Sequence, residues 1–384
     1  MTRPVRILLA RGYQVTPWEL RPWELLPQDR YEAAYLRLER NWFDDSALSL
    51  RRFPVKSIGA YVPRRAGSLM AGVVGDRYVD ADEAFAWADI VHAGELSYWF
   101  AADSARRKAR NRYRLVLTVW ETIPLLDVYR NRYARVARRQ TLAATDLFLA
   151  ATERARTALL LEGVDPGRIE VVPPGIDVER FRSPPPETPP DEHLIVSPGR
   201  LVWEKGHQDV MRALALLRRE GGPAARLLVV GSGPEEERLR AYAGELEIAD
   251  AVEFRSVPYA EMPAVFARAS CVVLASLATA SGGYYVGDVP RLFWEEQFGL
   301  VLAEAMAAGL PIVASSSGAI PEVAGDSATY FVPGDWPCLA RILAEGALAR
   351  PPGERVEHPA ERVRTFSAKA AADRLAAVYE RLLS

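Results

Sequence analysis

The sequence predicts an α/β protein with two doubly wound domains, and three observations support this fold class. The chain has 384 residues, more than one ordinary hydrophobic core accommodates. Short β-branched runs alternate with longer helical stretches, which is typical of a parallel sheet covered by helices. A proline-rich stretch, "SPPPETPP", can sustain neither a helix nor a central strand and therefore predicts a linker. We expect domains at 1–182 and 191–364, the linker at 183–190 and a closing helix at 365–384.

Five short apolar runs in the first half of the chain predict the strands of the N-terminal domain. These strands are expected at 5–10, 89–93, 114–120, 146–152 and 169–175. The final stretch, "SAKAAADRLAAVYERLLS", has the apolar spacing of an amphipathic helix and lies beyond the last domain strand.

The second half shows the alternation of strands and helices more clearly. Strands are expected at 193–201, 225–233, 252–257, 271–276 and 311–315. Helices are expected between them, at 206–220, 235–246, 260–270 and 300–308. This order predicts one complete doubly wound domain, whose ligands would bind beyond the carboxyl ends of the strands.

Composition excludes several classes of function. The formal net charge is −2, but residues 1–170 carry about +6 and the remainder about −8, which favours an anionic partner for the first half. No motif for reading nucleic acid accompanies this charge, so we expect no nucleic-acid partner. Cys271 and Cys338 provide neither a disulfide framework nor metal-ligand spacing, which fits a reducing cytoplasm and no bound metal. No run approaches the roughly 18 apolar residues of a spanning helix, so any membrane contact would be peripheral.

Two glutamates, Glu296 and Glu304, flank and enter an otherwise apolar stretch. The predicted helix at 300–308 is apolar on every face except at Glu304, so this carboxylate is expected to be buried and to need a partner. Glu296 precedes the helix, whose start also presents unpaired N–H groups. These N–H groups belong to Phe298, Gly299 and Leu300. A ligand with hydroxyls and phosphates would satisfy all of them; alternatively, Glu304 pairs with an internal arginine and Glu296 is a solvated loop acid.

A second candidate constellation is the cation pair in "SPGRLVWEKGHQDV". Arg200 follows a predicted strand and Lys205 precedes a predicted helix, so both cations are expected near the carboxyl edge of the sheet. A forked guanidinium and a compact ammonium together suit a diphosphate; the alternative is two solvated surface cations. Gly231 and Gly233, in "VVGSGP", predict either a phosphate-contacting turn or a plain turn between strand and helix.

These motifs together resemble a known enzyme family. "IEVVPPGIDVERF", "GRLVWEKG", "VVGSGP", "EQFGLVLAEAMAAGLPIVAS" and "GAIPEVAG" occur in the order seen in the retaining glycosyltransferases often numbered family four. The resemblance covers nearly all of residues 140–335. It implies the GT-B fold, in which two Rossmann-like domains face a cleft and the last helix crosses back to the N-terminal domain.

The resemblance also implies roles for the candidate residues. Arg200 and Lys205 would hold the donor diphosphate and stabilise the departing nucleotide in place of a metal, with no cofactor. Glu304 would accept hydrogen bonds from the ribose hydroxyls and Glu296 from the transferred sugar, helped by the N–H groups at 298–300. Val257, in "FRSVPY", is a candidate backbone contact to the base.

The N-terminal domain departs from the family pattern on the acceptor side. After the first strand the sequence offers only Gly12 where many relatives have a glycine-rich loop. Many relatives also place a histidine where this chain has Trp120, followed by Glu121. Trp120 cannot make the polar sugar contact of that histidine, whereas Glu121 or Thr122 could. His92 ends another predicted strand and is either a cleft residue or a structural histidine.

Cations are concentrated in two segments of the first half, 106–114 and 129–139. They predict either a solvated face or attraction to an anionic lipid or a phosphate-bearing acceptor. We expect a cytoplasmic protein, and under the second alternative it would contact the inner face of the membrane. The function we expect is retaining transfer of a hexosyl group from a nucleoside diphosphate sugar to a hydroxyl acceptor. The alternatives are a sugar-nucleotide epimerase of the same fold and a non-catalytic partner that binds a sugar nucleotide or a glycan.

Overall fold

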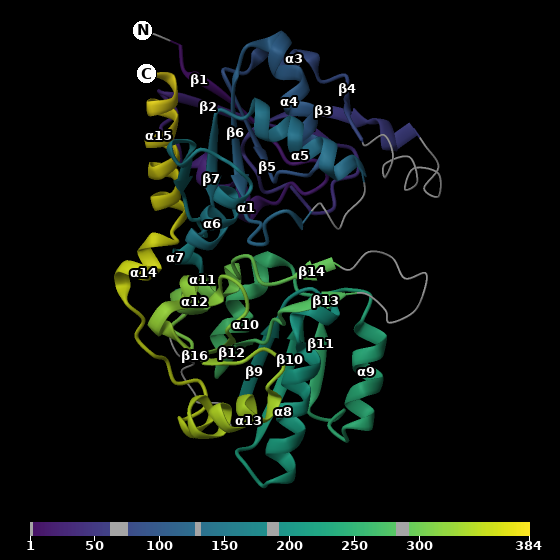
Figure 1. The fold of residues 1–384 in the computed structure, drawn as a ribbon. Helices are drawn as coiled ribbons and strands as arrows, with labels where there is room; N and C mark the ends of the chain where they lie inside the picture. Colours follow the sequence, from purple (N-terminus) through teal and green to yellow (C-terminus); the bar gives the residue numbers. More distant parts are fainter. Residues whose placement is uncertain (1–2, 62–75, 127–131, 183–191, 282–291) are drawn as a thin grey trace. The chain divides into compact units, whose positions relative to one another are not determined.

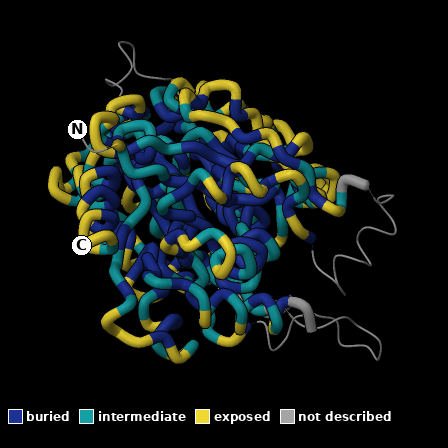
Figure 2. The backbone as a smooth tube through the Cα atoms, turned by 90° about the horizontal axis from the view of Figure 1, so that it is seen from above, coloured by how far each residue is buried: buried dark blue, intermediate teal, exposed yellow. Residues whose placement is uncertain are grey.

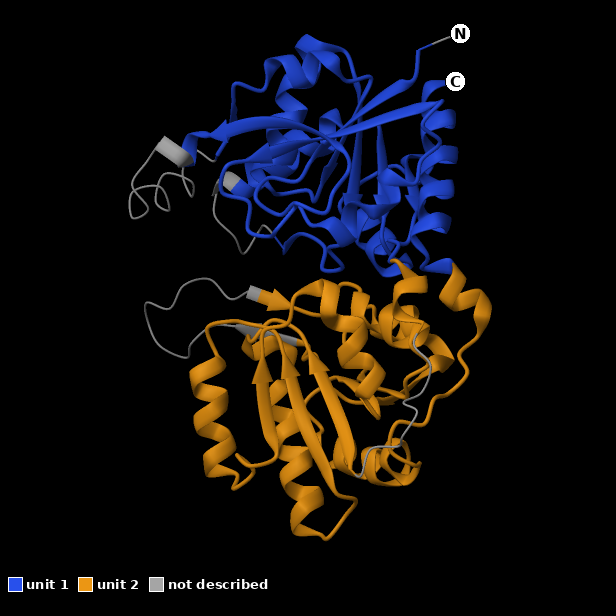
Figure 3. Cartoon of the chain, turned by 180° about the vertical axis from the view of Figure 1, so that it is seen from behind, with its two compact units in different colours: residues 1–176, 282–292, 365–384 blue, residues 177–281, 293–364 orange. Residues whose placement is uncertain are grey.

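The computed structural model divides the chain into two compact units, which Figure 3 colours separately. The first unit comprises residues 1–176, 282–292 and 365–384, and the second comprises 177–281 and 293–364. The structure describes residues 3–61, 76–126, 132–182, 192–281 and 292–384.

The first unit is built on an eight-stranded sheet with the order β4-β3-β2-β1-β5-β6-β7-β8, parallel except for the β3–β4 pair. Its strands are β1 Val5–Ala10, β2 Tyr31–Leu38, β3 Arg51–Ser57, β4 Tyr78–Val79, β5 Ile90–Gly94, β6 Arg114–Val119, β7 Leu147–Ala150 and β8 Ile169–Val171. Its helices are α1 Pro17–Glu24, α3 Asp82–Trp87, α4 Trp99–Asn111, α5 Arg132–Ala144, α6 Glu153–Leu161 and α15 Ala368–Leu383.

Helices cover both faces of this sheet. Along β1 the side chain of Leu8 joins one apolar cluster while Ile7 and Leu9 join another, as the alternation of a strand requires. The second cluster includes Trp23 of α1 and Tyr379 of α15, and the indole Nε1 of Trp23 donates to the Tyr379 hydroxyl at 2.8 Å. Figure 1 shows α15, in yellow, lying against the purple strands of this unit.

The second unit contains a six-stranded parallel sheet with the order β11-β10-β9-β12-β15-β16. Its strands are β9 His193–Pro198, β10 Ala225–Val230, β11 Val252–Arg255, β12 Cys271–Leu274, β15 Ile312–Ser315 and β16 Ala328–Phe331, beside a small β13 Thr279–Ser281 and β14 Leu292–Trp294 pair. Its helices are α7 Val178–Phe181, α8 His207–Arg219, α9 Glu236–Glu245, α10 Met262–Arg268, α11 Leu300–Ala307, α12 Ile320–Ala324, α13 Trp336–Glu345 and α14 Ala360–Thr365.

The chain order in this sheet creates one switch point. From β9 the chain proceeds through β10 to β11 on one side, and then through β12 and β15 to β16 on the other. The loops that follow β9 and β12 therefore diverge at the carboxyl ends of two neighbouring strands, where open α/β sheets bind ligands. Most residues of the central strands β9 and β12 are buried, so side chains at this edge are held by a rigid sheet. Figure 2 colours the whole backbone by burial, with buried residues in dark blue and exposed ones in yellow.

The ten predicted strands are confirmed, and the differences lie elsewhere. Strands β2, β3, β4 and β16 carry no clear apolar run and were not expected. The contact units divide at Ile176 and Asp177 rather than after residue 182, because Phe181 of α7 packs against Tyr259 and Phe266 of the second unit. The expected linker at 183–190 lies outside the described residues, and residues 365–384 belong to the first unit. Within the described residues, no helix combines the length and the apolarity needed to span a bilayer.

Candidate active site

The centre of the candidate site is an ion pair between Lys205 and Glu296 in the second unit. The ammonium Nζ of Lys205 lies 2.6 Å from the carboxylate Oε2 of Glu296, and the two side chains are only 14% and 8% exposed. The hydroxyl of Ser276, just beyond β12, donates to the same oxygen at 2.6 Å. The indole ring of Trp294 lies 5.0 Å from the Lys205 ammonium, close enough for a cation–π contact. The pair is thus held between the loops that follow β9 and β12.

The backbone of Glu296 is fixed by the segment that follows β15. Its N–H donates to the Ser317 hydroxyl at 3.2 Å, and its carbonyl accepts from the N–H of Ala319 at 2.8 Å. Between them, Gly318 has a φ of +53°, and a Cβ atom there would lie 2.1 Å from the Glu296 carbonyl oxygen. Only glycine allows this approach. The prediction that Glu296 could be a solvated loop acid is wrong, because the residue is buried and its carboxylate and backbone are bonded.

Arg200 lies close to this pair in the sequence but differs from it in environment. Its side chain is exposed, and its guanidinium makes no ion pair within the described ranges. Its carbonyl oxygen accepts from Nε2 of buried His207 at 3.1 Å, and Nδ1 of His207 accepts from the Ser197 hydroxyl at 2.8 Å. Burial lowers the pKa of His207 to about 4, so the ring is neutral near pH 7 and makes both bonds in one tautomer. The histidine therefore fixes the backbone from which Arg200 projects.

Glu304 lies inside α11, as predicted, and is buried. Burial raises the pKa of its carboxyl to about 7, against a smaller lowering by a hydrogen bond from the Tyr259 hydroxyl. No arginine pairs with Glu304 in the part of the chain that the structure describes, so the alternative of an internal arginine partner is wrong. A carboxyl with a raised pKa keeps its proton to higher pH, and in the protonated form it can both donate and accept hydrogen bonds.

The start of α11 and the loop after β11 hold the other donor-side candidates. Gly299 is the residue before α11, Leu300 is its first residue, and Phe298 is buried ahead of them. Val257 is half-buried beyond the end of β11. All of them belong to the second unit.

Gly231 and Gly233 serve close packing between two loops. A Cβ atom on Gly231 would lie 1.9 Å from the Gly199 carbonyl oxygen, and one on Gly233 would lie 2.3 Å from that of Leu201. The loop after β10 thus supports the loop that carries Arg200, which favours the plain-turn interpretation of these glycines.

The acceptor-side candidates all lie in the first unit. Gly12 follows β1, and its N–H donates to the Tyr78 hydroxyl at 3.0 Å. Trp120 follows β6, and its N–H donates to the Glu95 carboxylate at 2.9 Å. The Glu121 carboxylate accepts from the N–H groups of the two residues that follow it, both at 3.0 Å.

His92 lies in the interior of the first unit. Its Nδ1 is 2.6 Å from the Tyr379 hydroxyl and its Nε2 is 2.7 Å from the Thr118 hydroxyl. Burial, and to a lesser extent the charge of Arg11, holds the pKa of the ring well below its usual value. This geometry favours the structural histidine over a residue that lines a cleft.

Sequence reasoning missed several residues that complete the site. They are the bonding partners of the predicted residues: Ser276, Trp294, Ser317, His207 and Tyr259. The available signal was positional, since Ser276 ends one predicted strand and Ser317 follows another at the edge where ligands bind.

Family comparisons agree with both halves of the chain. A family model described as Glycosyltransferase Family 4 matches residues 8–180, and one described as Glycosyl transferases group 1 matches residues 179–346. A GDP-mannose-dependent alpha-(1-6)-phosphatidylinositol monomannoside mannosyltransferase of Mycolicibacterium smegmatis is 36% identical over 174 residues, 43% of this chain and 42% of that protein. A D-inositol 3-phosphate glycosyltransferase of Xylanimonas cellulosilytica is 29% identical over 315 residues, 75% of this chain and 70% of that protein.

Solved structures agree on the fold. The match covers 98% of this chain and 100% of the Anabaena protein Alr3699/HepE in complex with UDP and glucose, with a TM-score of 0.70 and 18% identity. For the sucrose-phosphate synthase of Thermosynechococcus elongatus the TM-score is 0.69 at 18% identity, covering 100% of this chain and 99% of that one. The mycobacterial relatives are matched over only about half of their length, 42% and 53%. On its two family domains and its GT-B fold, the chain belongs to glycosyltransferase family 4.

Proposed function

We propose that this chain is a retaining hexosyltransferase that moves a sugar from a nucleoside diphosphate to a hydroxyl acceptor. The observation that carries the proposal is the buried Lys205–Glu296 pair beside exposed Arg200, at the switch point of the second unit. A cation with a fixed position and a second, unpaired cation suit the two phosphates of a donor.

The leaving group is stabilised by positive charge rather than by a metal. Lys205 is already oriented by Glu296 and by the Trp294 ring, so it needs little reorganisation to meet a phosphate oxygen. Arg200 supplies a planar fork of donors to the same diphosphate. One preorganised donor of this kind contributes about 3–4 kcal/mol of transition-state stabilisation in other enzymes.

Glu304 recognises the ribose of the nucleotide. In its protonated form the carboxyl accepts a hydrogen bond from one ribose hydroxyl and donates one to the other, and in its ionised form it accepts from both. The N–H groups at 298–300 and the carboxylate of Glu296 bind the hydroxyls of the transferred sugar, and the backbone at Val257 contacts the base.

The chemical step balances without an enzymatic nucleophile. The acceptor oxygen forms the new bond to the anomeric carbon on the face from which the phosphate oxygen departs, and the acceptor proton passes to that phosphate. Glu296 is a weak nucleophile because one carboxylate oxygen already accepts from both Lys205 and Ser276. The products are a glycoside with retained anomeric configuration and a free nucleoside diphosphate.

The first unit holds the acceptor, and its basic surface favours an anionic or lipid-linked one. Part of the basic segment is neutralised internally, since Lys108 lies 2.7 Å from Asp146. Arg114 also lies 3.7 Å from Asp146, while Arg110 and Arg112 are exposed at the end of α4 and just after it. Each well-placed cation adds about 1 kcal/mol of attraction to an anionic membrane surface. A cytoplasmic enzyme in peripheral contact with the inner face of the membrane fits these features.

The test is release of free nucleoside diphosphate from UDP-, GDP-, ADP- and TDP-sugars, measured by chromatography with and without mixed acceptors. Release from one donor supports the proposal, and the anomeric coupling in the NMR spectrum of the product tests retention. Conversion of the donor sugar to its epimer, with no sugar transferred to an acceptor, would identify an epimerase. Binding of a donor without turnover would identify a non-catalytic partner.

A further inference from the structure

An aromatic surface in the first unit has no part in the site described above. It consists of Tyr13, Trp18, Trp42 and Phe43, and we call it the aromatic platform. Trp42 is 67% exposed, an unusual degree for the largest side chain, and Phe43 is also exposed. Exposed apolar patches of this kind mark binding surfaces.

The rings of the platform support one another in two pairs. Trp42 stacks on Tyr13 with ring centroids 6.1 Å apart and planes 12° apart. Phe43 meets Trp18 edge-on at 5.5 Å. The Tyr13 ring lies nearly parallel to the Trp42 indole, and Trp42 still leaves 67% of its surface exposed.

Polar contacts fix the backbone of the platform. The side-chain amide of Asn41 donates to the carbonyl oxygens of Val15 and Phe43, both at 2.8 Å, and its oxygen accepts from the N–H of Val15 at 3.1 Å. The backbone N–H of Trp42 donates to the Tyr13 carbonyl at 2.9 Å. The exposed rings are therefore presented by an ordered segment.

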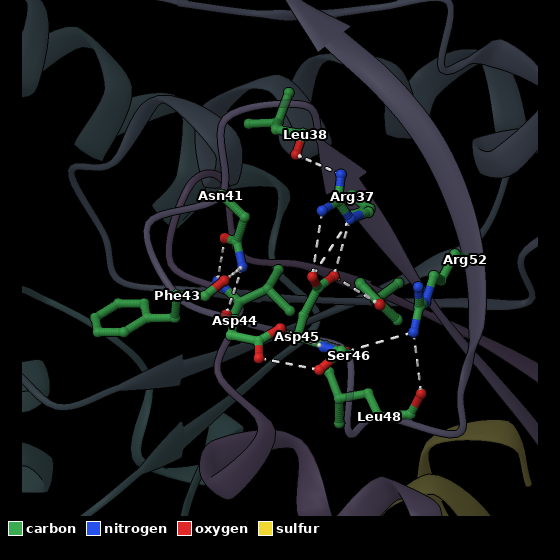
Figure 4. A network of polar contacts seen from close by, with 11 residues as sticks. Arg37, Leu38, Asn41, Phe43, Asp44, Asp45, Ser46, Leu48 and Arg52 are labelled. Carbon is green, nitrogen blue, oxygen red and sulfur yellow. Dashed lines mark hydrogen bonds and ion pairs between the residues drawn. The ribbon is translucent and has the colours of Figure 1, made fainter. Parts of the chain in front are cut away.

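Buried Asp45 anchors the other end of the segment (Figure 4). Its carboxylate accepts from the Tyr35 hydroxyl at 2.8 Å and from Nε of Arg37 at 3.1 Å, both on β2. Exposed Asp44, next to it, accepts from the N–H of Ser46 at 2.9 Å. A loop held at both ends loses little conformational entropy when a ligand binds.

The platform lies at the ligand-binding edge of its sheet. Tyr13 comes three residues after the carboxyl end of β1, and its ring lies 5.8 Å from that of Trp99, the first residue of α4. The hydroxyl of Tyr13 donates to Asp76 at 2.7 Å, which keeps the ring in place. This edge is where doubly wound sheets bind small molecules.

The charges around the platform indicate a neutral ligand. Glu39, Arg40 and Asp44 are all exposed and lie within three residues of Trp42 in the sequence, so both signs are present. Binding of anionic lipid is favoured by clustered cations, whereas interspersed donors and acceptors match the hydroxyl groups of a sugar. A saturated six-membered ring with hydroxyls on its rim has an apolar C–H face that can lie on an indole.

We propose that the aromatic platform binds the apolar face of a pyranose or cyclitol ring, stacked on the open face of Trp42. This inference rests on the proposed function in naming that ring as part of the acceptor. The hydroxyls of the ring then meet the polar groups at 39–44, and the ring is held at the carboxyl edge of the N-terminal sheet.

Saturation-transfer NMR on the full chain tests the proposal with methyl α-glucopyranoside, methyl α-mannopyranoside and myo-inositol as probes. We expect ring-proton signals from at least one probe in the wild-type protein, their loss in Trp42→Ala and their retention in Trp42→Phe. Leu161→Ala is the matched control, because Leu161 is 64% exposed in the same unit; it should bind like the wild type.

Two results would overturn the proposal. One is a failure of the NMR test: either no probe binds the wild type, or Trp42→Ala binds the probes as the wild type does. The other is that Trp42→Ala abolishes pelleting with neutral phosphatidylcholine vesicles while leaving probe binding intact, which would make the platform a lipid contact. Nucleotide release without acceptor is measured on the same variants. If no donor reacts but the probes still bind, the proposed function is refuted and the inference about the aromatic platform is not.

Discussion

The ammonium of Lys205 lies 2.6 Å from the carboxylate of Glu296, although 91 residues separate them in the sequence. Each residue follows a different strand of the second unit, and the switch point between β9 and β12 brings the two loops together. The pair is nearly buried, so each charge depends on the other for its solvation.

Removing one partner of this pair should destabilise the protein strongly. Lys205→Met leaves the Glu296 carboxylate buried without its cation, and we expect a loss of roughly 3 kcal/mol in the free energy of unfolding. Adding Glu296→Gln should recover part of this loss, because the unpaired charge is then removed. Urea denaturation of the two single variants and the double variant measures the coupling.

Arg218→Met is the matched control for the pair. Arg218 bonds Asp250 at 2.8 Å in the same unit, but both side chains are exposed. We expect a loss of at most about 1 kcal/mol there. If Lys205→Met and Arg218→Met lose the same free energy of unfolding, the claim that burial makes the Lys205–Glu296 pair important for stability is contradicted.

Gly318→Ala should disturb the site through Glu296. The new Cβ would lie 2.1 Å from the Glu296 carbonyl oxygen, so the loop that carries the carboxylate must move. Gly334→Ala is the control, since Gly334 also has a positive φ, +85°, but nothing within 4 Å of a Cβ atom. Both variants incur left-handed strain of about 1–2 kcal/mol, and only Gly318→Ala should also weaken donor binding, measured by calorimetry. Equal donor affinities in the two variants would speak against the role of this contact.

Glu304 should give stability a specific pH dependence. Its pKa is raised from 4.5 to about 7 in the folded protein, so between these values the folded state binds more protons than the unfolded state. This carboxyl therefore makes the free energy of unfolding fall as pH rises through that window, by about 3 kcal/mol at most, and contributes no further change above it. The free energy of unfolding of Glu304→Gln minus that of the wild type should therefore be larger at pH 8 than at pH 4.5. Urea denaturation of both proteins at the two pH values measures this difference. A difference between the proteins that does not vary with pH would refute the raised pKa.

Tyr379→Phe should reveal the structural role of His92. The Tyr379 hydroxyl accepts from Trp23 and bonds Nδ1 of His92, so its removal leaves two buried polar groups unsatisfied. We expect a loss of roughly 1–3 kcal/mol in stability, with nucleotide release from the donor unchanged. A loss of nucleotide release without a loss of stability would instead place His92 in the reaction.

The sequence predicted the fold where strands are continuous apolar runs. It did not predict β2, "YEAAYLRL", because its alanines, charged residues and leucines also suit a helix, and parallel pairing with β1 decides the outcome. Strand β3 contains Pro54, which argues against a central strand, yet the residue is exposed and the neighbouring β4 is short. Long-range pairing, rather than local pattern, settled these elements.

The same distinction applies to the site. The sequence predicted four charged site residues, because charged side chains within apolar runs or just after strands indicate a binding role. They are Arg200, Lys205, Glu296 and Glu304. That Lys205 and Glu296 bond each other was not predictable, because it depends on strand order.

Exposure of Trp42 was equally hidden in the sequence. The sequence does not show whether an aromatic residue in a loop is buried, because its packed neighbours decide this.

The central claim is that Lys205, Glu296 and Arg200 form the donor site of a glycosyltransferase, and nucleotide release tests it most directly. Initial rates of nucleoside diphosphate release are compared for the wild type, Lys205→Ala, Glu296→Ala and Arg200→Ala, with Arg218→Ala as control. We expect losses of about 100-fold or more in the three site variants, as for removal of a preorganised transition-state donor, and a wild-type rate in the control. Site variants that release nucleotide as fast as the wild type, while remaining folded, would contradict the account.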